Sequence, residues 1–296
     1  MEKLISTQIK PKTRHNYVAF FLTLACNLRC SYCINQHNKA LSRRQAKIRH
    51  LTGLEWIRAA NRLILRPDLP LTFQGGEPTL RKDFYLIVNE VKEEVKMDLL
   101  TNMAFDVDEF IKRVPVKRFT REAPYAPIRV SFHPGENDLD EIISKTFKLQ
   151  DAGFRVGIYG IIHPEDKIQS NILSAQEKCL KIGIDFRLKE FLGVYNGKMY
   201  GTFKYEGCVG GDRRNCECRT TELIVDPEGF VYKCHSDLYA GRGHIAHILD
   251  GGFNVEEMEK FRECKYFGQC NPCDVKVKTN RHQIFGHTSV EIRNIR

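Results

Sequence analysis

Apolar residues in the first two-thirds of the chain form two alternating patterns. Residues 17–25 make a dense apolar run, which is typical of a strand buried in a parallel sheet. Residues 52–65 instead repeat their apolar positions with helical spacing, and Thr52 can cap the N-terminus of that helix. The two patterns predict a strand followed by a helix that packs against it.

The alternation continues to residue 191. We expect further strands at residues 71–74, 97–101, 128–132, 154–162 and 184–191. We expect further helices at residues 83–95, 107–113, 139–151 and 172–181. Six strand–helix units with short links predict an α/β fold with a parallel sheet, flat or curled into a barrel. In such barrels the chemistry lies on the loops that follow the strands.

The pattern changes after this region. Residues 193–215 are rich in glycine without clear periodicity, and we expect a linker or irregular crossing segment there. Residues 216–296 form a predicted small cysteine-rich domain. It contains a hairpin signal, because strand-like residues 222–225 and 230–233 flank the turn sequence Asp-Pro-Glu-Gly. Residues 1–192 would then form the first domain.

The eleven cysteines favour metal sites over disulfides. No run of eighteen apolar residues and no signal-peptide order occurs, so we expect a cytoplasmic protein without a membrane span. That compartment keeps thiols reduced, and an odd number of cysteines cannot all pair within one chain. Three cysteines cluster in residues 26–33 and seven lie between Cys208 and Cys273, whereas Cys179 sits alone in a helical pattern as a small buried residue.

The first cluster reads Cys26-Asn-Leu-Arg-Cys30-Ser-Tyr32-Cys33. Iron–sulfur clusters are held by thiolates, and three of them leave one iron of a 4Fe-4S cluster open. An open metal position is where a substrate can coordinate. The alternatives are a structural zinc site or a chance grouping, although zinc sites more often use paired Cys-x-x-Cys units.

This loop resembles the signature of the radical S-adenosylmethionine (SAM) superfamily, Cys-x-x-x-Cys-x-aromatic-Cys after a first strand, with Tyr32 in the aromatic position. The family also carries a Gly-Gly-Glu-Pro motif after its second strand, and Gly75, Gly76, Glu77 and Pro78 stand there. The resemblance covers about residues 15–192. It implies a partial (β/α)6 barrel, related to the TIM barrel.

The resemblance also implies a mechanism. SAM would bind the open iron held by Cys26, Cys30 and Cys33, and an electron from the cluster would cleave it into methionine and a 5′-deoxyadenosyl radical. That radical would abstract a hydrogen atom from the substrate, so the enzyme would class as an oxidoreductase. An electron donor such as flavodoxin or ferredoxin would be a partner. The protein would supply positioning, burial and electrostatics.

Further SAM contacts are implied by the same resemblance. A carboxylate at Glu77 and the backbone of the two glycines would suit the SAM ammonium group, although the tetrapeptide is also turn-like by composition. Other contacts would come from the ends of later strands, where an ordinary packing role is the alternative. These residues are Thr101, Asn102, Ser131, Gly160 and Ile161.

The tail resembles SPASM and twitch domains, which bind auxiliary iron–sulfur clusters. Cys218 is followed by ten residues, Gly229, four residues and Cys234, as in the opening of those domains. With Cys270 and Cys273 they would hold one auxiliary 4Fe-4S cluster, with Cys264 as the substitute ligand. Cys208 and Cys216 are then left over, so a second cluster stays open. A zinc ribbon is the alternative.

The resemblance leaves the substrate undetermined. We expect hydrogen abstraction from a peptide or natural product. The enzymatic alternatives are a radical dehydrogenase of small sugars or alcohols and an RNA-modifying enzyme, and the net charge of +9 does not exclude a nucleic acid partner. The non-enzymatic alternatives are an iron–sulfur electron carrier and a zinc-binding module.

Overall fold

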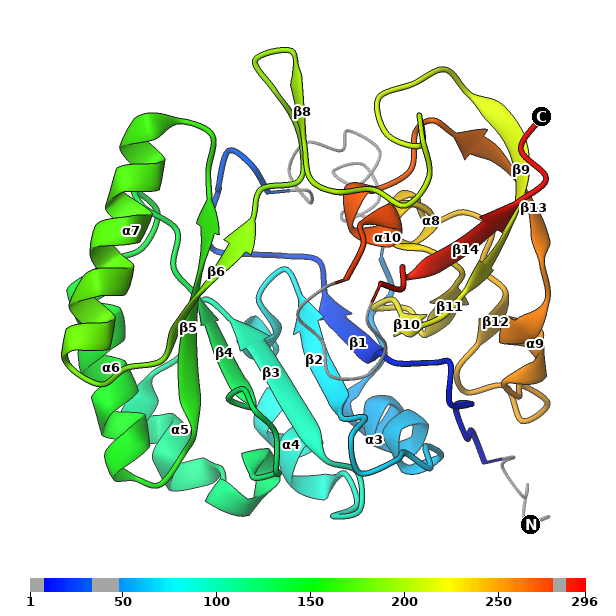
Figure 1. Ribbon diagram of the computed structural model, residues 1–296. Coiled ribbons are helices and arrows are strands. Elements are labelled where there is room, and N and C mark those ends of the chain that lie inside the picture. Colours follow the sequence, from blue (N-terminus) through cyan, green and yellow to red (C-terminus); the bar gives the residue numbers. More distant parts are fainter. Residues whose placement is uncertain (1–7, 34–47, 279–285) are drawn as a thin grey trace, which may run out of the picture.

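A computed structural model describes residues 8–33, 48–278 and 286–296. Its main feature is a nine-stranded sheet in the order β12-β11-β10-β1-β2-β3-β4-β5-β6 (Figure 1). The six strands from β1 to β6 pair in parallel, in chain order. They are β1 (Val18–Thr23), β2 (Leu71–Gly75), β3 (Met97–Thr101), β4 (Ile128–Ser131), β5 (Val156–Ile162) and β6 (Phe186–Glu190). The predicted parallel α/β sheet is confirmed.

Helices cover one face of this sheet (Figure 1). They are α3 (Gly53–Asn61), α4 (Phe84–Glu90), α5 (Val107–Arg113), α6 (Leu139–Asp151) and α7 (Asp166–Lys181), with short 3₁₀ helices η1 (Pro78–Leu80) and η2 (Val116–Phe119) between them. Thr52 caps α3 in a capping box with Glu55, as the sequence predicts. The helix α7 begins six residues before the predicted position.

The two faces of the parallel strands differ in polarity because side chains alternate along a strand. Val18, Phe20 and Leu22 of β1 are buried in the main apolar core, towards the helices. The opposite face carries polar groups as well, including a buried ion-pair network in which Asp98 binds Arg121 through two bonds of 2.7 and 2.8 Å and Arg129 through one of 3.0 Å. A polar interior leaves room for chemistry at the carboxyl ends of the strands.

The segment expected to be an irregular linker contains a hairpin of β7 (Gly193–Tyr195) and β8 (Lys198–Tyr200). Asn196 and Gly197 at its tip have φ angles of +47° and +76°. Two successive positive φ angles are what a two-residue hairpin turn requires, and Asn-Gly is its strongest sequence signal. Sequence reasoning missed this dipeptide because the surrounding glycines hid the short strands.

The tail extends the main sheet and adds a second one. Strand β10 (Leu223–Val225) pairs in parallel with β1, and it forms the predicted hairpin with β11 (Phe230–Tyr232), next to β12 (Ala246–His247). A separate antiparallel sheet places β9 (Arg214–Thr220) between β13 (Arg262–Phe267) and β14 (Val290–Arg293). The tail helices are α8 (His235–Ala240), α9 (Glu256–Glu259) and α10 (Pro272–Val275). The division into domains at residues 192 and 215 stays a prediction, and the sheet continues across it.

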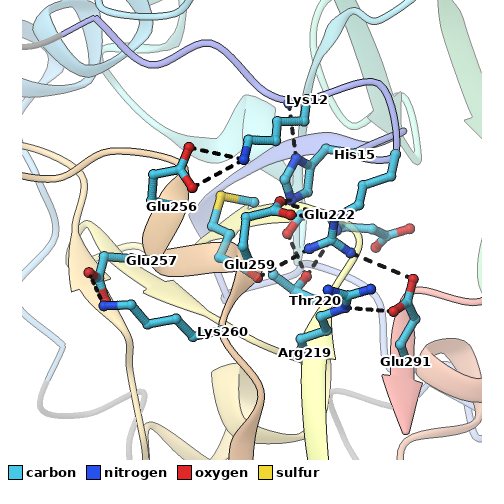
Figure 2. A network of polar contacts seen from close by, with 12 residues as sticks. Lys12, His15, Arg219, Thr220, Glu222, Glu256, Glu257, Glu259, Lys260 and Glu291 are labelled. Carbon is cyan, nitrogen blue, oxygen red and sulfur yellow. Dashed lines mark hydrogen bonds and ion pairs between the residues drawn. The ribbon is translucent and has the colours of Figure 1, made fainter.

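A polar network fastens the N-terminal segment to the tail (Figure 2). Lys12 pairs with Glu256 of α9 at 2.9 Å, and Arg14 binds Glu259 through two bonds of 2.9 and 3.0 Å. His15 lies beneath them, fully buried, with its Nε2 3.3 Å from Glu259. Burial, and then the charge of Arg14, lower the pKa of His15 to about 4.

Within the described ranges, no helix combines the length and the apolar character that crossing a membrane needs.

Candidate active site

The cysteine loop leaves β1 where the chain runs closely beside the two glycines that end β2. Gly76 N–H donates to Thr23 O and Glu77 N–H to Ala25 O, both at 2.8 Å. A Cβ on Gly75 would lie 1.9 Å from Thr23 O, and one on Gly76 would lie 2.0 Å from Ala25 O. The backbones therefore approach at a distance that only glycine permits.

Cys26, Cys30 and Cys33 line one cavity of about 310 Å³ at the carboxyl ends of the parallel strands. Most of the other SAM contacts implied by the sequence line the same cavity: Tyr32, Gly75, Gly76, Thr101, Asn102, Ser131 and Ile161. Three predicted contacts lie outside this lining: Glu77, Pro78 and Gly160. A Cβ on Gly160 would lie 2.9–3.0 Å from Ile172 and Phe186 of the core, so this glycine serves helix packing.

Glu77 is fully buried behind the cavity wall. Its carboxylate accepts hydrogen bonds from Thr101 Oγ1 at 2.8 Å, Asn102 N at 2.6 Å and Thr79 N at 3.1 Å. Burial raises the pKa of Glu77, and these donors oppose that shift. The expected contact between Glu77 and a SAM ammonium group is not what this arrangement provides, since the carboxylate is occupied in holding the end of β3.

Asn102 brings the end of β3 to the cysteine loop. Its Nδ2 donates to Asn27 Oδ1 at 2.9 Å and lies 3.5 Å from Cys26 Sγ. Its Oδ1 is buried and has no hydrogen-bond partner among the residues that the structure describes. A buried acceptor without a donor is costly, so it fits a ligand that brings an N–H group.

The three thiols suit a metal cluster. Burial raises the pKa of Cys26, and burial followed by the charge of Cys33 raises that of Cys30 to about 12. Thiolates are the ligating form, so binding of iron would release protons here. With the acceptor on Asn102 and the glycine-lined approach, these residues fit a 4Fe-4S cluster with SAM beside it.

Sequence reasoning missed His133, which also lines the cavity. Its Nδ1 is 2.9 Å from the Tyr32 hydroxyl, and burial followed by the charge of Lys189 lowers its pKa to about 4. The imidazole is therefore neutral at neutral pH. Its position two residues after Ser131, at the end of a strand, is the signal that could have identified it.

A second, small cavity lies in the tail. Four cysteines line it, Cys218, Cys234, Cys264 and Cys270, together with the charged residues Lys233, Asp237, Arg242 and Asp274. The sulfur atoms of Cys216, Cys218 and Cys264 all lie within 4.8 Å of one another, on the paired strands β9 and β13. The buried Lys233 donates to Asp237 beside them, so a cation accompanies the thiols.

The predicted auxiliary ligands are not all brought together. Cys273 lines the first cavity with Cys26, Cys30 and Cys33, and it lies outside the lining of the tail cavity within the described residues. Cys264, the expected substitute, lines the tail cavity instead. Cys208 and Cys216 are buried in an apolar cluster of the tail, where Cys264 and Cys270 pack against them.

Curated relatives match short parts of the chain. Molybdenum cofactor biosynthesis protein 1 of Drosophila melanogaster is 37% identical over 78 residues, which are 26% of this chain and 13% of that protein. GTP 3′,8-cyclase of Haemophilus ducreyi is 34% identical over 92 residues, 30% of this chain and 26% of that protein. GTP 3′,8-cyclase of Actinobacillus pleuropneumoniae is 28% identical over 169 residues, 56% and 41% respectively. The chain thus matches less than half the length of each of these relatives.

Solved structures resemble the chain over more of its length. Native anSMEcpe with bound AdoMet matches at a TM-score of 0.51 and 14% identity. The match covers 83% of this chain and 80% of the anSMEcpe chain. The match to the same protein with bound AdoMet and Kp18Cys peptide covers 91% of this chain and 92% of that chain, also at 14% identity and a TM-score of 0.51. At this identity the likeness concerns the fold, and it confirms the partial barrel.

The family model of the Radical SAM superfamily matches residues 20–169, about half of the chain. The matched residues run from β1 and the cysteine loop into α7 and so contain most of the large cavity's lining. A domain of this family implies binding of a 4Fe-4S cluster and of SAM. The chain therefore belongs to the radical SAM superfamily and is a radical SAM enzyme.

Proposed function

We propose that this enzyme holds a 4Fe-4S cluster on Cys26, Cys30 and Cys33, binds SAM in the cavity of about 310 Å³, and abstracts a hydrogen atom from its substrate. The observation that carries the proposal is that the three cysteines and Asn102 line one cavity at the strand ends, where the buried Oδ1 of Asn102 has no hydrogen-bond partner in the described part of the chain. When bound, the cluster supplies the electron that cleaves SAM and produces the 5′-deoxyadenosyl radical.

The residues of the chain would bind and orient SAM. Asn102 Oδ1 would accept a hydrogen bond from the SAM ammonium group, and Glu77 would hold Asn102 in place from behind. Gly75 and Gly76 would keep the cysteine loop against β2. Ile161, with an apolar side chain, would cover another part of SAM, and His133 would fix Tyr32 beside the cluster. Such preorganisation keeps a reactive radical away from water.

We further propose one auxiliary 4Fe-4S cluster in the tail, with Cys218, Cys234, Cys264 and Cys270 as its ligands. The support is their common cavity, in which Cys264 takes the place that the sequence pattern assigned to Cys273. Four thiolates close the coordination of such a cluster, so its role would be electron transfer. Lys233, buried against Asp237 in the same cavity, would offset part of its negative charge.

For the substrate we propose a peptide or natural product, on the resemblance of the tail to SPASM and twitch domains. A nucleoside triphosphate is the second candidate, since the curated relatives include GTP 3′,8-cyclases. The two candidates make different predictions, because only a substrate that fits the cavity should stimulate SAM cleavage. GTP that leaves the rate of 5′-deoxyadenosine formation unchanged would remove the second candidate. An external one-electron donor such as ferredoxin or flavodoxin would complete the system.

The decisive test is SAM cleavage by anaerobically reconstituted protein reduced with dithionite. We expect 5′-deoxyadenosine from the wild type and none from the Cys26→Ala/Cys30→Ala/Cys33→Ala variant, which should keep about four irons per chain in the tail. Cys179→Ala, which removes a buried thiol of α7, is the control and should behave as wild type. Product from the triple variant would refute the SAM site, and zinc in place of the remaining iron would refute the auxiliary cluster.

A further inference from the structure

Cys273, an exposed residue, lies on the wall of the large cavity. It comes from α10 in the tail, whereas the cysteine loop comes from the start of the barrel. Cys273 shares the wall of this cavity with Cys26, Cys30 and Cys33. A tail residue thus reaches the place where the radical would form.

The position of Cys273 is fixed from several sides. The Asn271 side chain accepts a hydrogen bond from Cys273 N at 2.9 Å and so caps α10. The Asp274 carboxylate accepts bonds from His235 N and Ser236 N of α8, at 2.9 and 3.2 Å. Lys276 pairs with Glu190 at the end of β6, at 2.9 Å. These contacts tie α10 to the tail on one side and to the barrel on the other (Figure 1).

Cys273 is also separate from the other tail thiols. Cys218, Cys234, Cys264 and Cys270 line the tail cavity, and Cys273 lines the other one. Asn102, on the wall of the same cavity, gives an independent sign of a ligand, because its buried Oδ1 has no partner among the residues described. A thiol held against a ligand site, and outside the proposed cluster ligands, is available for chemistry.

We propose that Cys273 is a catalytic residue that donates a hydrogen atom to the substrate radical. This inference rests on the proposed function. An S–H bond is weaker than an alkyl C–H bond, so transfer of hydrogen from a thiol to a carbon radical is downhill. The product would be the substrate with the abstracted hydrogen replaced by one that exchanges with solvent.

The step balances with one further electron. The C–H bond of the product forms as the S–H bond of Cys273 breaks, which leaves a thiyl radical on the protein. A second electron, from the external one-electron donor, would reduce the thiyl radical to a thiolate, and a proton from solvent would restore the thiol. In sum, SAM, the substrate, two electrons and one proton yield methionine, 5′-deoxyadenosine and the product. The external one-electron donor supplies both electrons.

The test needs no identified substrate, because without one the thiol can quench the 5′-deoxyadenosyl radical itself. The holoenzyme is incubated in D₂O with SAM and dithionite, without added thiols, and the deuterium in 5′-deoxyadenosine is measured by mass spectrometry. We expect singly deuterated product from the wild type. Cys273→Ser, whose O–H bond is too strong to donate, should lose the label. Cys179→Ser and Tyr239→Phe should keep it.

The outcomes separate this inference from the proposed function. No 5′-deoxyadenosine from the wild type would refute the proposed function itself. Normal product whose label survives in Cys273→Ser, or is lost in Tyr239→Phe, would refute the donor role alone. Iron analysis of Cys273→Ser guards against a structural explanation: about eight irons per chain should remain. A loss of about four would make Cys273 a cluster ligand and overturn the inference.

Discussion

At the residue scale, the polar groups around the cavity divide into those that face a ligand and those that hold them. Asn102 lines the cavity and has a buried Oδ1 without a partner among the described residues, whereas the Glu77 carboxylate accepts hydrogen bonds from Thr79, Thr101 and Asn102. A buried carboxylate with several donors is stable only while those donors stay in place. In the proposed function, Glu77 would therefore act on SAM through the residues it positions.

Glu77→Gln tests this positioning role. The amide nitrogen would replace either Oε2, which accepts from Asn102 N, or Oε1, which accepts from Thr79 N, so two donors would face each other in both orientations. We expect the free energy of unfolding to fall by about 1–3 kcal/mol. If about 1 kcal/mol of SAM binding is lost with it, calorimetric titration will show a Kd raised about fivefold.

Glu109→Gln is the matched control, because Glu109 forms a surface pair with Arg113 on α5. It should change the free energy of unfolding by less than about 0.5 kcal/mol. An unchanged Kd and unchanged stability in Glu77→Gln would contradict the positioning role and leave the motif as a turn.

The residues of the site differ in how far the sequence could reveal them. The spacing of the three cysteines predicts their common cavity, because one short loop carries them all. The direction in which the Glu77 side chain points depends on its hydrogen bonds to the end of β3, a strand that starts twenty residues later. No local sequence pattern encodes these hydrogen bonds. Cys273 shows the same limit: a Cys-x-x-Cys pair suggests shared ligation, but Cys270 lines the tail cavity and Cys273 lines the large one.

At the element scale, β1 is the strand on which the site is built. It pairs in parallel with β2 on one side and with β10 of the tail on the other. The cysteine loop that follows it packs on the Gly75-Gly76 backbone at distances that exclude any side chain. The loop therefore depends on the end of β2 for its shape.

Gly76→Ala tests this dependence. The new Cβ would lie 2.0 Å from Ala25 O, a backbone atom, so the cysteine loop must move. Such overpacking costs typically about 1–3 kcal/mol. We expect iron analysis to show about four fewer irons per chain, with the auxiliary cluster retained. Gly251→Ala, where no atom lies within 4 Å of the added Cβ, should load fully. Full iron loading of Gly76→Ala would disprove the close-approach argument.

Helices and strands with strong hydrophobic periodicity lie where the sequence predicts them, and the exceptions have physical reasons. The predicted start of α7 was late because Asp166–Ser170 offers few apolar residues to mark a buried face. The β10–β11 hairpin was predicted, but its pairing with β1 was not. That pairing joins residues 205 positions apart, such as Val18 and Leu223, and the apolar runs of both strands allow other partners as well.

At the scale of the whole molecule, barrel and tail are joined at several places. The main sheet runs from β6 to β12, Lys276 just after α10 pairs with Glu190 at the end of β6, and the N-terminal segment binds α9 and β14. Residues that would handle the radical thus come from both ends of the chain. Such an arrangement makes the fold sensitive to any group that titrates in a joint.

His15 is such a group, and it makes stability depend on pH. Its folded pKa of about 4 lies below the ordinary 6.5, so the unfolded chain binds more protons between these values. The contribution of neutral His15 to the free energy of unfolding is therefore complete above pH 6.5 and is lost as pH falls towards 4.

Between pH 7.5 and 5 the free energy of unfolding should fall by about 2 kcal/mol more in the wild type than in His15→Gln. Anaerobic urea unfolding of both proteins at the two pH values measures this difference, in which the contribution of His133 cancels. Parallel losses in the two proteins would mean that His15 takes up its proton without opening the joint between Arg14, Glu259 and the N-terminal segment.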